Sequence, residues 1–98
     1  MSYQILFSDD ANYDMVKLEQ YIRERLKAPI TASKYMEDLD NIIQKLAVYA
    51  DIISINEFVQ EKFGNNARHI NFKKMAIIYI VENDIVYIER IIASSLIY

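Results

Sequence analysis

Residues 67–93 read ARHINFKKMAIIYIVENDIVYIERIIA, and the pattern of this stretch decides the fold. Three runs within it are rich in Ile, Val, Tyr and Phe, the residue types that favour β-strands. The runs occupy residues 67–73, 75–82 and 85–93. They are separated at Lys73-Lys74 and at Asn83-Asp84, and breaks this short predict tight turns between antiparallel strands. We therefore expect a meander of three strands.

The middle strand of this meander is apolar on both faces. Its alternating residues are Ile77, Tyr79 and Val81 on one face and Ala76, Ile78 and Ile80 on the other. A strand that is covered on both sides has such a pattern. In the third strand, alternation places Arg90 on the face of Val86, Ile88 and Ile92. An arginine among apolar neighbours predicts a carboxylate partner.

The sequence before the meander has the spacing of two long helices. Apolar residues recur every three or four positions from Ala11 to Leu26, which predicts a helix over about residues 9–27. Ser8 is a suitable N-cap for it. Pro29 ends this helix, because a residue that precedes proline avoids the α region.

A second apolar stripe runs from Ala32 to Tyr49 and predicts another helix that begins near Thr31. The short connection makes the two helices an antiparallel αα-hairpin. Residues 3–8 have the alternation of a short strand. Residues 51–66 show no dominant period, and we expect an irregular connection with one short helical turn around 56–62.

The expected order is β-α-α-β-β-β, an α+β fold in which an antiparallel sheet packs on the αα-hairpin. The first strand is expected beside the meander, and residues 1–98 form one domain. The helix pair can bury one face of the sheet, and no other segment has a long apolar stripe. We therefore expect a partner protein or a second copy to cover the other face.

The composition fits one small cytoplasmic domain. Of the 98 residues, 53% are hydrophobic and 26% are charged, which is too apolar for a disordered chain. The absence of cysteine excludes disulfides and cysteine-based metal sites. No signal peptide is evident, and no stretch reaches the roughly 18 apolar residues that a membrane span needs. The net charge of −3 weighs against stable DNA binding and against RNA contacts through phosphates.

Several motifs, in this order along the chain, resemble those of the RelE/ParE toxin superfamily. They are Phe7-Ser8-Asp9-Asp10-Ala11, Asp14 and Tyr21-Ile22 in the first helix, Ala32 and Leu46 in the second, and Arg68 at the start of the sheet. The most specific motif pairs residues 75–81, MAIIYIV, with residues 86–96, VYIERIIASSL, across a short turn. The resemblance spans nearly the whole chain. It implies the same fold and the function of a growth-inhibiting toxin from a bacterial toxin–antitoxin pair.

Five positions depart from the motifs of this superfamily, which includes the RelE-like, ribosome-dependent nucleases. Met75 replaces a tyrosine, Ala76 stands where those nucleases place an arginine, and Ala93 replaces a histidine. Ser95-Leu96 replaces a basic pair. Such basic and histidine groups stabilise the cleaved phosphate and move its protons, which alanine and leucine cannot do. The resemblance therefore favours ParE-like members, which bind DNA gyrase.

Five residues are candidates for a functional site: Arg68, Lys73, Lys74, Arg90 and Tyr98. Arg68 either reaches a target or bridges the sheet to the negative end of a helix. The two lysines either contact a target or are solvated turn residues. Arg90 pairs with a carboxylate of this chain or of an antitoxin, and Tyr98 either takes part in RNA cleavage or packs its ring on the domain.

The single histidine, His69, has no second ligand at a suitable spacing, so we expect neither a metal nor another cofactor. Our leading hypothesis is a ParE-like toxin that inhibits a protein target such as gyrase and is neutralised by a cognate antitoxin. The first alternative is a RelE-type nuclease acting on mRNA at the ribosome, with Arg68, Lys73, Lys74 and Tyr98 in a rearranged site. The second is an inactive family member that serves as a binding or regulatory module.

Overall fold

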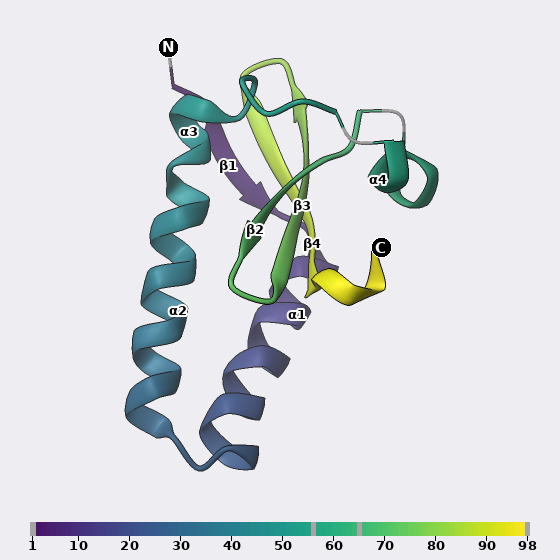
Figure 1. The fold of residues 1–98 in the computed structure, drawn as a ribbon. Coiled ribbons are helices and arrows are strands. Elements are labelled where there is room, and N and C mark those ends of the chain that lie inside the picture. Colours follow the sequence, from purple (N-terminus) through teal and green to yellow (C-terminus); the bar gives the residue numbers. More distant parts are fainter. Residues whose placement is uncertain (1, 56, 65, 98) are drawn as a thin grey trace.

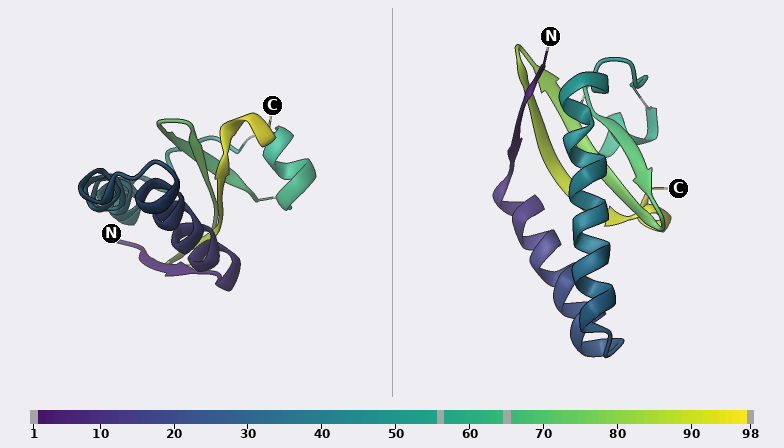
Figure 2. Two further views of the ribbon diagram at one scale, coloured as in Figure 1. Left: turned by 90° about the horizontal axis from the view of Figure 1, so that it is seen from below. Right: turned by 90° about the vertical axis from the view of Figure 1, so that its left-hand side faces the viewer.

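The computed structural model describes residues 2–55, 57–64 and 66–97 and contains three layers (Figures 1 and 2). The strands are β1 (Gln4–Phe7), β2 (Arg68–Phe72), β3 (Met75–Glu82) and β4 (Ile85–Ala93). The helices are α1 (Asp9–Gln20), its π-helical extension η1 (Tyr21–Arg25), α2 (Pro29–Gln44), α3 (Leu46–Tyr49), α4 (Glu57–Phe63) and the 3₁₀ turn η2 (Ser94–Leu96). The α1–α2 hairpin covers one face of the sheet, and α4 with η2 lies at the other face.

The four strands form one sheet in the order β1-β4-β3-β2. The meander of β2, β3 and β4 is antiparallel, as the sequence predicts. The α+β fold class is confirmed, but β1 runs parallel to β4, so the sheet is mixed where we expected an antiparallel one. A strand's hydrophobic alternation is the same in either direction, and the long helical connection from β1 to the meander permits a parallel neighbour. The direction of β1 was therefore not readable from its residues.

A β-bulge interrupts the pairing of β3 with β4 at Glu89, because Ile78 pairs with Arg90 and Tyr79 with Ile88. One extra residue shifts the alternation of side chains beyond it. Ile91 therefore joins Ile88 in the main core, and Ile92 packs against the opposite face. The expectation that Ile92 shares a face with Ile88 was wrong.

Ser8 connects this bulge to the start of α1. Its hydroxyl accepts a hydrogen bond from the Ala11 backbone N–H at 2.9 Å, which confirms the predicted N-cap. The same hydroxyl donates to the carbonyl of Glu89 at 2.7 Å. One side chain thus fixes the N-terminus of α1 on β4.

The hairpin between α1 and α2 differs in detail from the prediction. The first helix ends in the π-helical turn at Arg25, and Lys27 has a positive φ of 52°. Pro29 is the first residue of α2, two residues before the predicted start at Thr31. A proline is suitable there, because the first N–H of a helix has no intrahelical acceptor.

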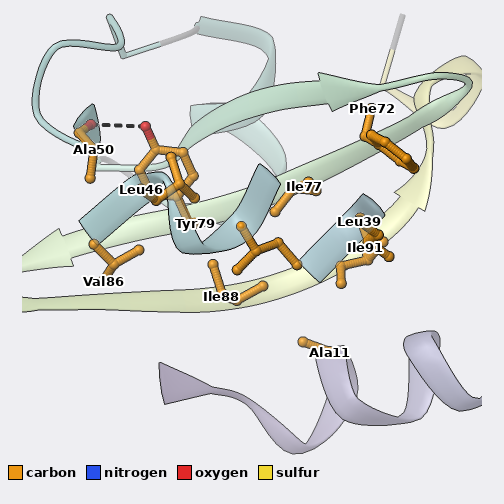
Figure 3. Packing of buried hydrophobic residues seen from close by; sticks show 11 residues of the cluster. Ala11, Leu39, Leu46, Ala50, Phe72, Ile77, Tyr79, Val86, Ile88 and Ile91 are labelled. Atoms are coloured by element: carbon orange, nitrogen blue, oxygen red, sulfur yellow. Dashed lines mark hydrogen bonds between the residues drawn. The ribbon is translucent and has the colours of Figure 1, made fainter. Parts of the chain in front are cut away.

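The main core lies between the helices and the sheet (Figure 3). Its buried members are Ala11, Leu39, Ile43, Leu46, Ala50, Phe72, Ile77, Tyr79, Val86, Ile88 and Ile91. A second core lies on the other face of β3, and its described buried members are Val59, Ala67, Ala76, Ile78 and Ile97. The two sets of alternating β3 residues therefore face two cores, as the sequence predicts.

The second core corrects one expectation. We expected a partner or a second copy to cover this face, but α4 and the C-terminal residues of the same chain cover it. Residues 51–66 lack a single period because α4 is only two turns long. A short helix of this kind leaves too little periodicity to be recognised as a cover for a sheet.

Candidate functional site

Arg68, at the start of β2, is held by the C-terminal end of α3. Its Nη1 donates to the carbonyl of Ala50 at 2.9 Å. The hydroxyl of Tyr79 donates to the same carbonyl at 2.8 Å (Figure 3). Carbonyls at a helix C-terminus carry partial negative charge, which an arginine compensates. Arg68 thus makes a structural contact between the sheet and the end of α3.

Tyr79 supplies a pH-dependent part of the stability. Burial raises the pKa of its phenol from 10.0 to about 12. Because the folded-state pKa is the higher one, this contribution is complete below about pH 10 and is lost as the pH rises toward 12.

We predict that the Tyr79→Phe variant loses less stability than the wild type when the pH rises above about 10. At neutral pH the variant should be less stable by about 1 kcal/mol, because it lacks the hydrogen bond to Ala50. Between about pH 10 and 12 the wild type should lose on the order of 2 kcal/mol more than the variant. Urea unfolding across this pH range measures both differences. Tyr13→Phe, which alters an exposed ring, is the control. Its free energy of unfolding should fall with rising pH as steeply as that of the wild type.

Arg90 is paired with Asp14, a carboxylate of its own chain. Nε and Nη2 of Arg90 donate to the two carboxylate oxygens at 2.8 and 3.0 Å, and the backbone N–H of Ile91 donates to Asp14 at 2.9 Å. These bonds to Asp14 raise the pKa of Arg90. The side chain of Asp14 is only 11% exposed. The pair fixes α1 on β4 just beyond the bulge.

Lys73 and Lys74 lie in the β2–β3 turn, as predicted, at the rim of an apolar groove. The groove has a volume of about 360 Å³ and is lined by Leu18, Tyr21, Ile22, Leu26, Tyr35, Lys73 and Lys74. We call it the hairpin groove. The ammonium of Lys73 lies 4.9 Å from the ring centre of Tyr35, a cation–π distance.

The hairpin groove continues onto exposed apolar side chains. Tyr21 is 52% exposed and Leu26 is 57% exposed, and both belong to its lining. Exposed apolar surface of this kind beside cationic groups is typical of a protein-binding site. The apolar stripe predicted that Leu26 is buried, but this residue follows the π-helical turn η1 in the connection to α2, where periodicity along the helix does not determine burial.

The five candidate residues therefore do not form one cluster. Arg68 contacts Ala50, Arg90 contacts Asp14, and the two lysines border the hairpin groove. Tyr98 lies outside the described residues. Burial lowers the pKa of His69. Within residues 2–55, 57–64 and 66–97, no three His, Asp or Glu side chains are grouped to hold a metal ion.

The positions that differ from the RelE-like pattern lie at the start of β3, at the end of β4 and in η2. Ala76 is fully buried in the second core, together with Val59 and Ile97. Ala93 ends β4 opposite Met75, and the Leu96 side chain is 61% exposed in η2. The face on which a nuclease would present its arginine from position 76 is therefore covered by α4 and the C-terminal residues.

No helix in the part of the chain that the structure describes is long and apolar enough to cross a membrane.

Comparison with known proteins identifies the family. The family model described as the ParE toxin of the type II toxin–antitoxin system parDE matches residues 5–98. No curated protein matches the sequence. Among solved structures, the chromosomal ParDE toxin–antitoxin system of P. aeruginosa superposes with a TM-score of 0.78 at 15% identity, covering 94% of this chain and 96% of that chain. The E. coli DinJ-YafQ toxin–antitoxin complex superposes with a TM-score of 0.52 at 11% identity, covering 100% and 99%. The chain therefore belongs to the ParE toxin family of type II toxin–antitoxin systems.

Proposed function

We propose that this toxin stops growth by binding a protein target such as DNA gyrase, without cleaving RNA, and that a cognate antitoxin neutralises it. The burial of Ala76 carries the proposal against RNA cleavage. Its side chain has no exposed surface and lies among apolar residues of the second core. A cationic group there cannot reach a phosphate unless α4 moves away.

The second argument concerns the remaining cations. Arg90 is engaged by Asp14 and Arg68 by the carbonyl of Ala50. Lys73 and Lys74 border an apolar groove and not a polar cleft. RNA cleavage needs cations and proton-transfer groups that converge on one phosphate. Protein binding needs only an apolar surface with a polar rim.

Growth of bacteria that express the chain alone tests the proposal. We expect growth to stop, purified protein to inhibit supercoiling by gyrase, and translated mRNA to remain intact. Cleavage within translated mRNA would instead support the RelE-type nuclease. Normal growth despite accumulation of folded protein would support the inactive binding module and would contradict both toxin activities.

We further propose that an amphipathic segment of the antitoxin lies in the hairpin groove. The groove offers apolar side chains from α1, η1 and α2, and Lys73 and Lys74 stand at its rim. A segment with apolar residues on one face and acidic residues beside them complements these groups. The same contact would hold the helix pair and the β2–β3 turn together.

We predict that Leu26→Asp weakens antitoxin binding roughly tenfold or more, because a carboxylate in an apolar contact is left without a partner. The unfolding temperature should change little, since the side chain is 57% exposed. Calorimetric titration with the purified antitoxin measures the affinity. Val48→Asp is the matched control, because Val48 is 54% exposed but lies in α3. Equal affinity of the two variants would exclude the groove as the antitoxin site.

A further inference from the structure

The structure contains a cover for the second sheet face that the chain builds from two distant segments. One is α4 and the other is the C-terminal turn, residues 94–97. Both lie on the side of the sheet away from α2, and they are side by side in two views (Figures 1 and 2). We call the two segments together the cap.

The two halves of the cap hold each other. Val59 of α4 is fully buried, Ile97 of the turn is 4% exposed, and both belong to the second core. The ammonium of Lys62 in α4 donates to the carbonyl of Leu96 in the turn at 2.6 Å. Because Val59 and Ile97 are buried in the same core, loss of one half exposes apolar surface on the other.

The cap is also separate from the main core. Among the residues whose burial is described, the second core shares none with the main core, because alternate residues of β3 face opposite sides. The residues beneath the cap include Ala76 of β3 and Ala67 just before β2, whose small side chains allow close approach but contribute little apolar contact. Segments with few buried apolar contacts open locally at a lower free energy than the global fold.

We infer that α4 and the C-terminal turn open together as one unit while the helix hairpin and the sheet remain folded. The closed cap is an intramolecular cover of an apolar sheet face, made by Ala76, Ile78 and their neighbours in the second core. Opening exposes that face and frees the C-terminal turn at the same time. This inference does not depend on which protein the toxin inhibits.

Hydrogen exchange of the full-length protein, read by mass spectrometry, tests the inference. Peptides from α4 and from the C-terminal turn should exchange at similar rates, well ahead of β3 and α2. The decisive variant is Ile97→Ala, which changes the turn only. It should speed exchange in α4 at least about tenfold and leave β3 unchanged, because a buried isoleucine supplies much of the contact within so small a core.

Leu96→Ala is the matched control, since it alters an exposed neighbour and keeps the carbonyl that Lys62 contacts. This substitution should leave the rate of hydrogen exchange in α4 unchanged. Val59→Ala gives the reciprocal result, with faster exchange in the C-terminal turn. If Ile97→Ala prevents folding, Ile97→Val should still speed exchange in α4 about threefold.

Unchanged exchange in α4 after the Ile97 substitutions would overturn the inference. So would equal exchange of α4 and β3 in the wild type, because the cap would then open only with the whole domain.

Discussion

Replacing Ala76 by Arg is expected to destabilise the protein by about 3 kcal/mol or more, without creating a nuclease. The alanine is fully buried in the second core, so a guanidinium would be placed among apolar side chains without a carboxylate. The excess volume adds strain. Urea unfolding followed by circular dichroism measures the loss, and a translated mRNA tests for cleavage.

Glu82→Arg is the control for the added charge, because it introduces an arginine at the exposed end of the same strand. Its stability should stay within about 0.5 kcal/mol of the wild type. Wild-type stability of the Ala76→Arg variant would mean that this position is not covered in solution. Cleavage of mRNA by that variant would show that the nuclease surface is accessible.

Replacing Asp14 by Ala is expected to cost about 2–3 kcal/mol, which corresponds to a fall of roughly 10 °C or more in the unfolding temperature. The carboxylate accepts two hydrogen bonds from Arg90 and one from the backbone of Ile91. Its removal leaves the partly buried N–H without its acceptor. The loss should be less than for a fully buried ion pair, because Arg90 is 39% exposed and water can solvate its guanidinium.

Asp14→Asn separates the charge from the hydrogen bonds. An amide oxygen can still accept from Ile91, so this variant should lose less stability than Asp14→Ala. Asp9→Ala, which removes an exposed carboxylate from the start of the same helix, should cost under about 1 kcal/mol. Equal stabilities of the Asp14→Ala and Asp9→Ala variants would contradict a structural role for the pair.

The helix pair, the meander and the family motifs were predictable from particular residues. The N-cap at Ser8 follows from a hydroxyl placed just before the apolar stripe, and the structure confirms it. The burial of β3 on both faces was predictable from its uninterrupted apolar run, because a polar side chain between two cores is costly unless it is hydrogen-bonded. The carboxylate partner of Arg90 was predictable as a residue type, but its identity as Asp14 needed the contact between α1 and β4.

The candidate site was less predictable, for three different reasons. The hairpin groove brings Leu18, Tyr35 and Lys73 together from separate elements. The sequence pattern within one element does not predict such a contact between elements. The bulge at Glu89 moves Ile91 and Ile92 to opposite faces, because one unpaired residue reverses the alternation. The cap joins α4 to the last residues of the chain, a contact between segments with weak patterns of their own.

The elements, their order and the family were readable from the amino-acid sequence, because helical and strand periodicities and turn residues act over short distances. Residues 67–93 formed the predicted meander, with strands at 68–72, 75–82 and 85–93. Three outcomes required the packed fold: β1 lies parallel to β4, Arg90 pairs with Asp14, and α4 and Ile97 bury Ala76. Those outcomes depend on contacts between residues far apart in the chain. Such contacts form, and stabilise the fold, only when the helices and the sheet pack together.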